Sequence, residues 1–299
     1  MDRSLIAAAL LLLAGGVYAG PVKYNAGEFT DTAKMAKKLT AGKQLKKLKK
    51  WNVSNIIITE CVGEFMQSRE VSAGAMESRW SDFTIKTQST IDLGGDYYNS
   101  VADRVYTLVQ KAFEDNGFSF VSKESLMENE RYQKLNLEFE KKTRGYTGGV
   151  MKQSVTTKGM KRSATGLGIY PSNPLTAIKL AVGVADMTAE IKADSAMRIK
   201  FYVDKGKNGT PVLKTFEVLI SGDLRGEEVG FKGHKKMSYG FRRQDENIFA
   251  LEKPITSTVD IQGEGKGSVD MKKYDEALFA IVGSVVDMLG HSLKEASGA

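Results

Sequence analysis

Two glutamates have the residue type and spacing for acid–base chemistry. Glu60 and Glu64 follow the β-branched run Ile56-Ile57-Ile58, so they would lie toward the end of a buried strand. Paired carboxylates can donate and accept protons during hydrolysis. Because nothing nearby in the sequence supplies a partner, we expect both to be solvent-facing residues at a strand exit. In a hydrolase, Glu60, Glu64 and Asp96 would be the acids to test first.

Cysteine and histidine are sparse and isolated. Cys61 is the single cysteine; it has no histidine neighbour and no CxxC spacing, so we expect a buried, small apolar residue. The two histidines, His234 and His291, lie far apart and form no HxxxH or His/Cys cluster, which argues against a zinc or iron site. His291 falls near the end of a predicted helix, where a packing or capping role is expected.

Catalytic and nucleotide-binding motifs are also missing from the sequence. Gly94-Gly95-Asp96 precedes a predicted helix and could hold an anion at its N-terminus. No GxGxxG or GxxxxGK[ST] pattern accompanies it, and neither GxSxG nor HExxH occurs around the histidines. We therefore expect a protein that is not an enzyme and has no catalytic residue, cofactor or metal.

The N-terminus has the features of a secretory signal peptide. Asp2-Arg3 precede an apolar run from Leu5 to Leu13, and small residues flank a cleavage position after Ala19. The run is shorter than the roughly 20 residues that cross a bilayer, although an uncleaved anchor is the alternative. Residue 20 is glycine rather than a lipid-bearing cysteine, and no later segment is expected to span a membrane. We predict that residues 1–19 are a cleaved signal peptide, which indicates a periplasmic or secreted protein.

Residues 20–50 form a lysine-rich lead segment. Eight lysines between positions 34 and 50 exceed the net charge of +7, so the rest of the chain is slightly acidic. A nucleic-acid-binding domain would carry its positive charge on the folded surface, so we expect no nucleic-acid partner. The thin apolar stripe favours a solvated helix; the alternative is a helix that contacts an anionic membrane surface or an acidic partner. The candidate contact residues are Lys34, Lys37, Lys38, Lys46, Lys47, Lys49 and Lys50.

The clearest structural pattern lies in residues 99–132. Apolar residues recur at helical spacing up to Gly117, where a C-terminal cap is expected. The run Phe118-Ser119-Phe120-Val121 then predicts a short buried strand, and Ser122 can cap a second helix. We expect this helix–strand–helix unit to position the strand Val53 to Met66.

Further strands and a closing helix follow from alternation and periodicity. Phe83, Ile85 and Thr87 alternate with polar residues and predict one half-exposed strand. Residues 197–203 and 212–220 predict a hairpin around the turn dipeptide Asn208-Gly209. Partial alternation between 248 and 261 fits one more hairpin or an edge strand. Residues 270–295 predict an amphipathic helix.

Two glycine-rich polar regions interrupt these elements, near 141–174 and 222–267. The first is predicted to be either a mobile arm that orders on a partner or a flexible insertion. Residues 51–299 are then a single domain with two insertions. The order of elements indicates an α+β fold, a mixed β-sheet packed by helices on one side.

Three segments resemble a group of exported bacterial envelope proteins. They are the strand from Ile56-Ile57-Ile58 to Glu64-Phe65, the unit from Val101-Ala102-Asp103 to Phe118-Ser119-Phe120-Val121, and the strand pair around Tyr202-Val203-Asp204 and Thr215-Phe216 with the closing helix. The group includes the curli-secretion channel family, the lipoprotein activators of penicillin-binding proteins and the N-terminal domain of the Tol-system β-propeller protein. The resemblance implies an assembly or regulatory role without chemistry of its own.

This chain departs from those relatives in two ways. It lacks the cysteine that would anchor a lipoprotein, and its glycine-rich regions lack the clean alternating segments of roughly 10 residues that membrane strands need. We therefore expect an exported, non-enzymatic envelope protein that binds or assembles with other envelope proteins or with itself, as a homo-oligomer. The first alternative is an oligomeric outer-membrane secretion pore component, and the second is a hydrolase.

Overall fold

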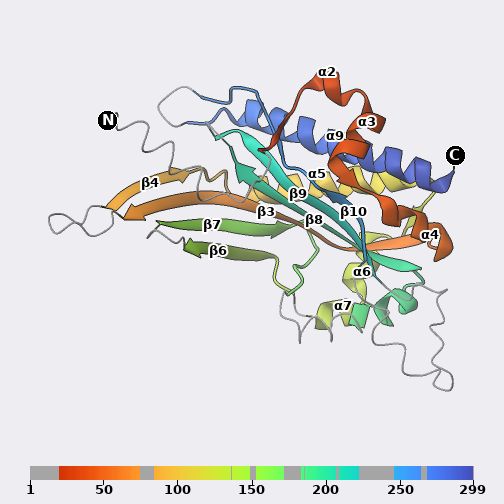
Figure 1. Cartoon of the computed structure of the whole chain (residues 1–299). Helices are drawn as coiled ribbons and strands as arrows, with labels where there is room; N and C mark the ends of the chain where they lie inside the picture. The colour runs from red at the N-terminus through yellow and green to blue at the C-terminus, as the bar shows by residue number, and fades with distance from the viewer. Residues whose placement is uncertain are drawn as a thin grey trace.

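The protein has an α+β fold built on one mixed sheet, which contains eleven strands within the residues that the structure describes (Figure 1). The structure is a computed structural model. It describes residues 20–74, 84–135, 137–148, 153–171, 183–184, 186–206, 209–221, 246–263 and 268–298. The predicted signal peptide, His234, Asn208 and Phe83 lie outside these residues.

The strands are β1 (Val22–Lys23), β2 (Thr40–Ala41), β3 (Asn55–Gly74), β4 (Thr84–Thr90), β5 (Ser119–Phe120), β6 (Glu140–Gly148), β7 (Gln153–Ser163), β8 (Ser195–Lys205), β9 (Pro211–Ser221), β10 (Glu246–Leu251) and β11 (Ile255–Thr256). The helices are α2 (Ala26–Phe29), α3 (Thr32–Leu39), α4 (Lys46–Lys50), α5 (Gly95–Glu114), α6 (Lys123–Glu128), α7 (Glu130–Lys134) and α9 (Met271–Ser297), with a 3₁₀ turn η1 (Lys43–Leu45).

The long strand β3 is the centre of the sheet. Its first half pairs in parallel with β8, from Ile56↔Ser195 to Phe65↔Val203, and its second half pairs antiparallel with β4 from Ser68 onward. On its other edge β3 pairs first with β5 in parallel and then with β7 antiparallel. The sheet continues outward through β8 and β9 on one side and through β7 and β6 on the other.

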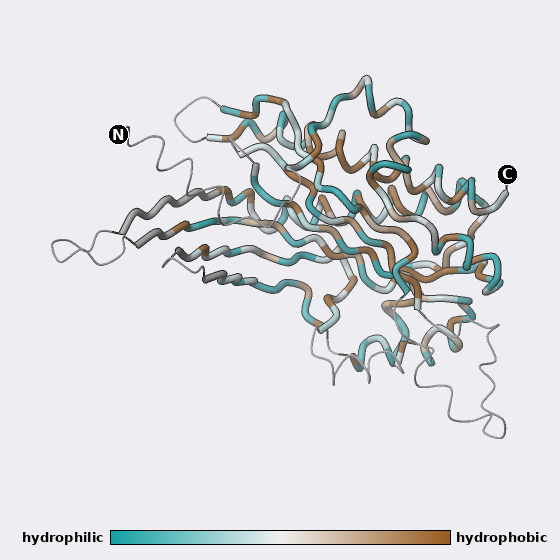
Figure 2. The backbone as a smooth tube through the Cα atoms, in the orientation of Figure 1, coloured by the Kyte–Doolittle hydropathy of each residue, from teal (hydrophilic) through white to brown (hydrophobic). Residues whose placement is uncertain are grey.

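Two long helices, α5 and α9, cover one face of the body of the sheet, and the core lies beneath them. Both helices contribute buried apolar side chains, and Figure 2 shows hydrophobic residues gathered along these helices and the central strands. Both helices have a recognisable cap at one end. Asp270 accepts a hydrogen bond from Lys273 N at the start of α9, and Gly117 adopts a φ of 87° after α5, which glycine tolerates without strain.

The lysine-rich lead is part of the folded domain. Its helices α3 and α4 pack on α9, and the apolar stripe of Leu39, Leu45 and Leu48 is buried in the core. The segment also contributes β1 and β2 to the sheet. We expected a solvated helix. The lysines are mostly exposed, as expected, but the leucines are buried and attach the segment to the core.

Helix α9 is long and apolar enough, by length and composition, to cross a membrane, contrary to the expectation that no later segment would be. Half of its most apolar window is buried inside the protein, including Leu278, Ile281 and Val285. The core helix of a soluble protein has the same features. The apolar character of α9 is therefore weak evidence for a membrane span.

The region near 141–174 contains regular secondary structure. Residues 140–148 and 153–163 form the antiparallel strands β6 and β7, which extend the sheet from β3. The second glycine-rich region includes β10 and β11, both paired with β9, while residues 222–245 lie outside the part of the chain that is described. The predicted hairpin is formed by β8 and β9, and Gly209 in its turn has a φ of 82°.

Candidate functional site

Four antiparallel strands extend beyond the helix-covered body and form the most distinctive surface of the molecule. We call them the strand platform: β4, the part of β3 from Ser68 onward, β7 and β6, in that spatial order. Figure 1 shows these strands projecting away from the end of the molecule where α4 and the C-terminus lie. The platform begins at the register shift between Met66 and Ser68, where the neighbour of β3 changes from β8 to β4.

The two outer strands of the platform run in opposite directions. Strand β3 runs outward from the body, β4 and β7 return, and β6 runs outward again, because each adjacent pair is antiparallel. Within the described residues, no strand pairs with the outer side of β4 or of β6. Such edges carry backbone N–H and C=O groups that can pair with another strand.

A buried carboxylate holds the base of the platform to the body. Asp204, at the end of β8, is only 4% exposed, and Arg69 Nη2 on β3 donates to its two oxygens at 2.9 and 3.1 Å. Lys214 Nζ on β9 lies 2.7 Å from Asp204 Oδ2, and Lys205 N donates to Oδ1 at 2.7 Å. Charge-assisted hydrogen bonds are stronger than neutral ones, so this cluster fixes β3 where it leaves β8.

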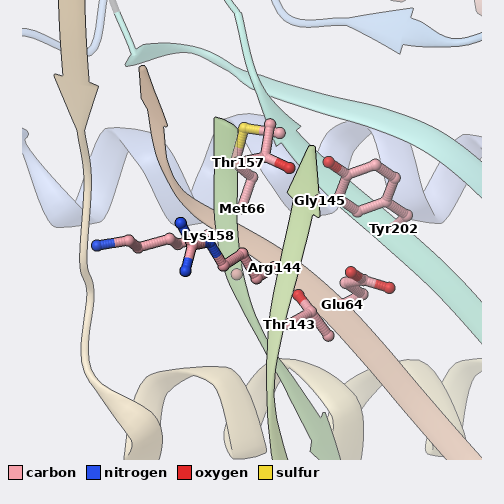
Figure 3. Close-up of a pocket in the computed structure, with 9 residues that line it drawn as sticks. Glu64, Met66, Thr143, Arg144, Gly145, Thr157, Lys158 and Tyr202 are labelled. Atoms are coloured by element: carbon pink, nitrogen blue, oxygen red, sulfur yellow. The ribbon is translucent and has the colours of Figure 1, made fainter. Parts of the chain in front are cut away.

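Near the base of the platform, the backbones of β7 and β3 approach each other closely. Gly159 pairs with Thr143, and a Cβ on Gly159 would come within 2.8 Å of Phe65 O. Figure 3 shows the shallow pocket of about 150 Å³ that results, with Glu64 and Tyr202 on one side and Arg144 and Lys158 on the other. Lys161 Nζ lies 3.3 Å from Glu64 Oε2 beside it. The pocket is small and open, and its ion pair is half exposed, so its geometry suits a structural role better than a catalytic one.

Register places different side chains on the two faces of the platform. Val71 pairs with Val155, and Glu70 pairs with Thr156, which in turn pairs with Tyr146. Neighbouring rows belong to opposite faces of a sheet, so Val71 and Val155 share one face with Arg69 and Thr157, and Glu70, Thr156 and Tyr146 lie on the other.

Exposed apolar side chains accompany the β6 edge. Tyr146 on β6 is 70% exposed, and Phe139, the residue before β6, is 60% exposed. Phe139 lines a groove of about 270 Å³ together with Met127 and Leu137. Large exposed apolar residues that gather at one place are typical of interaction surfaces.

The two candidate acids of the sequence have separate structural partners. Glu60 is buried at 1% exposure, so the expectation of a solvent-facing residue was wrong for it. Its Oε2 accepts from Arg198 Nε at 2.7 Å and its Oε1 from Tyr170 N at 2.6 Å. Arg198 also lies over the Tyr170 ring, 4.4 Å from its centroid. Glu64 is half-buried and pairs with Lys161 instead. Asp96 is an exposed residue in the first turn of α5. Glu60 and Glu64 nevertheless line one pocket of about 190 Å³, whereas Asp96 is not among its lining residues.

Cys61 is fully buried, and its Sγ donates to Ala102 O of α5 at 3.4 Å. Burial raises the pKa of its thiol well above the usual value, aided by the nearby Asp103 and Glu60 carboxylates. His291 lies 3.4 Å from Glu295 on α9. Among the residues that the structure describes, no group of three or more His, Cys, Asp or Glu side chains is suited to hold a metal ion.

The lysines of the lead lie on its outer side. Lys34, Lys37 and Lys38 of α3 are exposed, as are Lys46, Lys49 and Lys50 of α4. Lys47 is half-buried; its Nζ lies 4.0 Å from Glu246 Oε2 and 5.5 Å from the Trp51 ring centroid. The seven predicted residues therefore lie on two helices, α3 and α4, which both pack on α9. Figure 1 shows α4 at the end of the molecule remote from the free ends of the platform.

Sequence reasoning predicted β4 as one strand but missed β6, β7 and the outer half of β3, for which the signal was weak. The segments that form β6 and β7 are rich in threonine, glycine and lysine and resemble insertions, although Ser154-Val155-Thr156-Thr157 contains β-branched residues. Comparison of the chain with protein-family models, with curated proteins and with solved structures gives no match. Function must therefore be inferred from the geometry of the chain itself.

Proposed function

We propose that this is an exported, non-enzymatic cell-envelope protein that assembles with copies of itself through the two edges of the strand platform. The observation that carries the proposal is the opposite direction of β4 and β6. If β4 of one copy lies against β6 of the next, the new pair is antiparallel, like every other pair in the platform. Each added copy then contributes four strands to one continuous antiparallel sheet. The strand pair between two copies has the same antiparallel direction as the pairs within each platform.

Three features of the described residues support this assembly. Strand β6 carries the exposed charges Lys141, Lys142 and Arg144, which are typical of protected sheet edges, but Tyr146 also projects from it as a large exposed aromatic. The groove around Phe139 and Met127 lies at the base of the same edge and offers apolar area for a neighbouring copy. The Asp204 cluster gives the platform a rigid attachment, so pairing needs no large rearrangement.

The pairing of both candidate glutamates with cations and the resemblance to envelope assembly proteins support the same class of function. Glu60 is occupied by Arg198 and Tyr170 N, and Glu64 by Lys161. Both carboxylates line one pocket, but each is held by a cation, and this pairing supports a structural role for them.

Size-exclusion chromatography with light scattering on residues 20–299 tests the proposal. We expect the wild-type protein to form a discrete oligomer and Tyr146→Lys to shift it to monomer, because an edge lysine disfavours strand pairing. Val259→Lys, at another exposed apolar residue away from the platform, is the matched control and should leave the oligomer intact. A wild-type chain that stays monomeric at every concentration, in buffer and in detergent, would contradict self-assembly.

A pore is the second candidate, and the two-faced platform is the observation that favours it. In a closed ring of copies, the row containing Val71 and Val155 could face lipid while the row containing Glu70 and Thr156 lines the interior. Release of a trapped dye from vesicles tests this function. Leakage caused by wild-type protein and lost in Tyr146→Lys supports a pore, whereas an oligomer that leaves vesicles intact supports assembly alone.

A further inference from the structure

A concave apolar groove lies at the end of the molecule opposite the platform. It has a volume of about 320 Å³, and its walls come from the α4 region, the start of β3, the turn after α5 and the end of α9. Its apolar lining includes Leu48, Val53, Phe118, Leu293 and Ala296. This volume is at the lower end of the range of about 300–1,000 Å³ found for ligand-binding sites.

Lysines surround one side of this groove. Lys49 lines it directly, Lys46 and Lys50 are exposed on the same short helix, and Lys294 is exposed beside Leu293 on α9. No acidic residue occurs from Thr32 to Lys50. Among the described residues, no acidic side chain forms an ion pair with Lys46 or Lys49. An apolar cavity with a cationic border is complementary to a ligand that combines apolar side chains with negative charge.

We propose that this groove binds an acidic, amphipathic peptide segment of a partner protein. One or two apolar side chains of the segment enter the groove, and flanking Asp or Glu residues contact the lysines of α4. This inference does not depend on self-assembly through the platform, because the groove lies at the other end of β3. Twenty strand residues separate the two ends of β3, a span of roughly 60 Å.

A peptide fits this surface better than a membrane does. Peripheral membrane proteins insert apolar side chains that protrude from a basic face. The large exposed hydrophobic residues of the described chain are Val71, Met127, Phe139, Tyr146, Val259 and Met271, and none belongs to α3, α4 or the end of α9. The apolar surface here is recessed, so it can receive a protruding side chain but cannot enter a bilayer.

A nucleic acid is also a poor fit for this surface. Single-stranded nucleic acids stack their bases on accessible aromatic side chains. The aromatic residue nearest to these lysines in sequence is Trp51, which is buried, and Phe118 is half-buried in the wall of the groove. The lysines therefore lack the aromatic surface that would accompany base recognition.

A fluorescent synthetic peptide with two leucines flanked by glutamates is the probe, and anisotropy measures its binding to residues 20–299. We expect Lys49→Glu to weaken binding at least about tenfold through charge reversal. Ala296→Phe should weaken it similarly by filling the groove. Lys272→Glu changes the net charge equally at the far end of α9 and should bind like wild type. Circular dichroism checks that each variant is folded.

Two further probes make the result decisive. A peptide with serines in place of the leucines should bind much more weakly; equal binding would show charge attraction alone and overturn the proposal. Anionic lipid vesicles should bind wild type no better than the Lys49→Glu variant. Vesicle binding that depends on Lys49, with no binding of the leucine peptide, would also overturn the proposal and assign the surface to membranes.

Discussion

The Asp204 carboxylate accepts hydrogen bonds from the Arg69 guanidinium at 2.9 and 3.1 Å, and this contact joins the base of the strand platform to the β8–β9 hairpin. Asp204 is buried, whereas the side chains of Arg69 and Lys214 are 38% and 40% exposed. If the carboxylate is removed, water can therefore solvate the two cations. However, β3 loses the hydrogen bonds that hold it against the end of β8.

We expect Asp204→Asn to lower the free energy of unfolding by about 2 kcal/mol, because a buried, charged acceptor is replaced by a neutral amide. Urea denaturation followed by tryptophan fluorescence measures this. Lys214→Met should cost less than about 1 kcal/mol, since it removes a half-exposed partner. Equal effects of the two substitutions would show that the carboxylate is not the central element of the cluster.

The Glu60–Arg198 pair should behave as a coupled unit. The side chains are 1% and 11% exposed, so Glu60→Met leaves a guanidinium largely buried without this carboxylate and should cost about 3–5 kcal/mol. The double substitution Glu60→Met with Arg198→Met should cost less than the sum of the single changes. A double-mutant cycle from denaturation midpoints gives the coupling energy, and strict additivity would mean that the pair contributes little.

Two glycines should respond to alanine in opposite ways. Gly159→Ala brings a Cβ within 2.8 Å of Phe65 O and should destabilise the protein by about 1–3 kcal/mol. A Cβ added to Gly283 in α9 would enter open space, with no neighbouring atom within 4 Å, so Gly283→Ala should stabilise the protein by about 1 kcal/mol through helix propensity. Thermal unfolding compares the two, and a stable Gly159→Ala variant would mean that β3 and β7 are not so closely packed.

Cys61 should be inert in the native state. Its thiol is fully buried, and burial raises its pKa well above the usual value, so very little thiolate exists at neutral pH. A chromogenic disulfide reagent should react negligibly with native protein and stoichiometrically after unfolding in guanidinium chloride. Rapid labelling of native protein would reveal local opening between β3 and α5.

Stability should decrease at alkaline pH. Burial raises the pKa values of Tyr98, Tyr106 and Tyr132 to about 12 each, above the value near 10 of an unfolded chain. Between these values the unfolded chain loses protons that the native protein retains, so the free energy of unfolding falls as pH rises through this window. Urea midpoints across the window, with tyrosinate absorbance, test the prediction. A constant midpoint would contradict it.

The helix–strand–helix unit and α9 were predictable because their information is local. Apolar spacing and caps identify α5 and α9, and the predicted cap Ser122 accepts a hydrogen bond from Ser125 N. The β8–β9 hairpin follows from alternation on both sides of the turn. In these segments the buried apolar residues recur with the period of a single helix or strand, so the sequence pattern predicts the structure directly.

The lead segment shows where local reasoning reached only part of the answer. Its lysines are mostly exposed, and its few leucines gave no reason to expect a place in the core. Leu39, Leu45 and Leu48 are buried because α9 and the sheet supply the other side of the contact. Contacts with elements so distant in sequence cannot be predicted from the hydrophobic pattern of the lead segment alone.

The sequence by itself determined the α+β class, the two long helices, the β8–β9 hairpin and the isolation of its histidines and cysteine. Only the tertiary structure decided that Glu60 pairs with Arg198, 138 residues away, and that the glycine-rich region near 141–174 contributes the platform strands β6 and β7. Those strands have little apolar periodicity of their own. They are extended because β7 forms backbone hydrogen bonds with β3, and β6 forms them with β7. The pairing of β7 with β3 depends on register between distant segments rather than on local side-chain pattern.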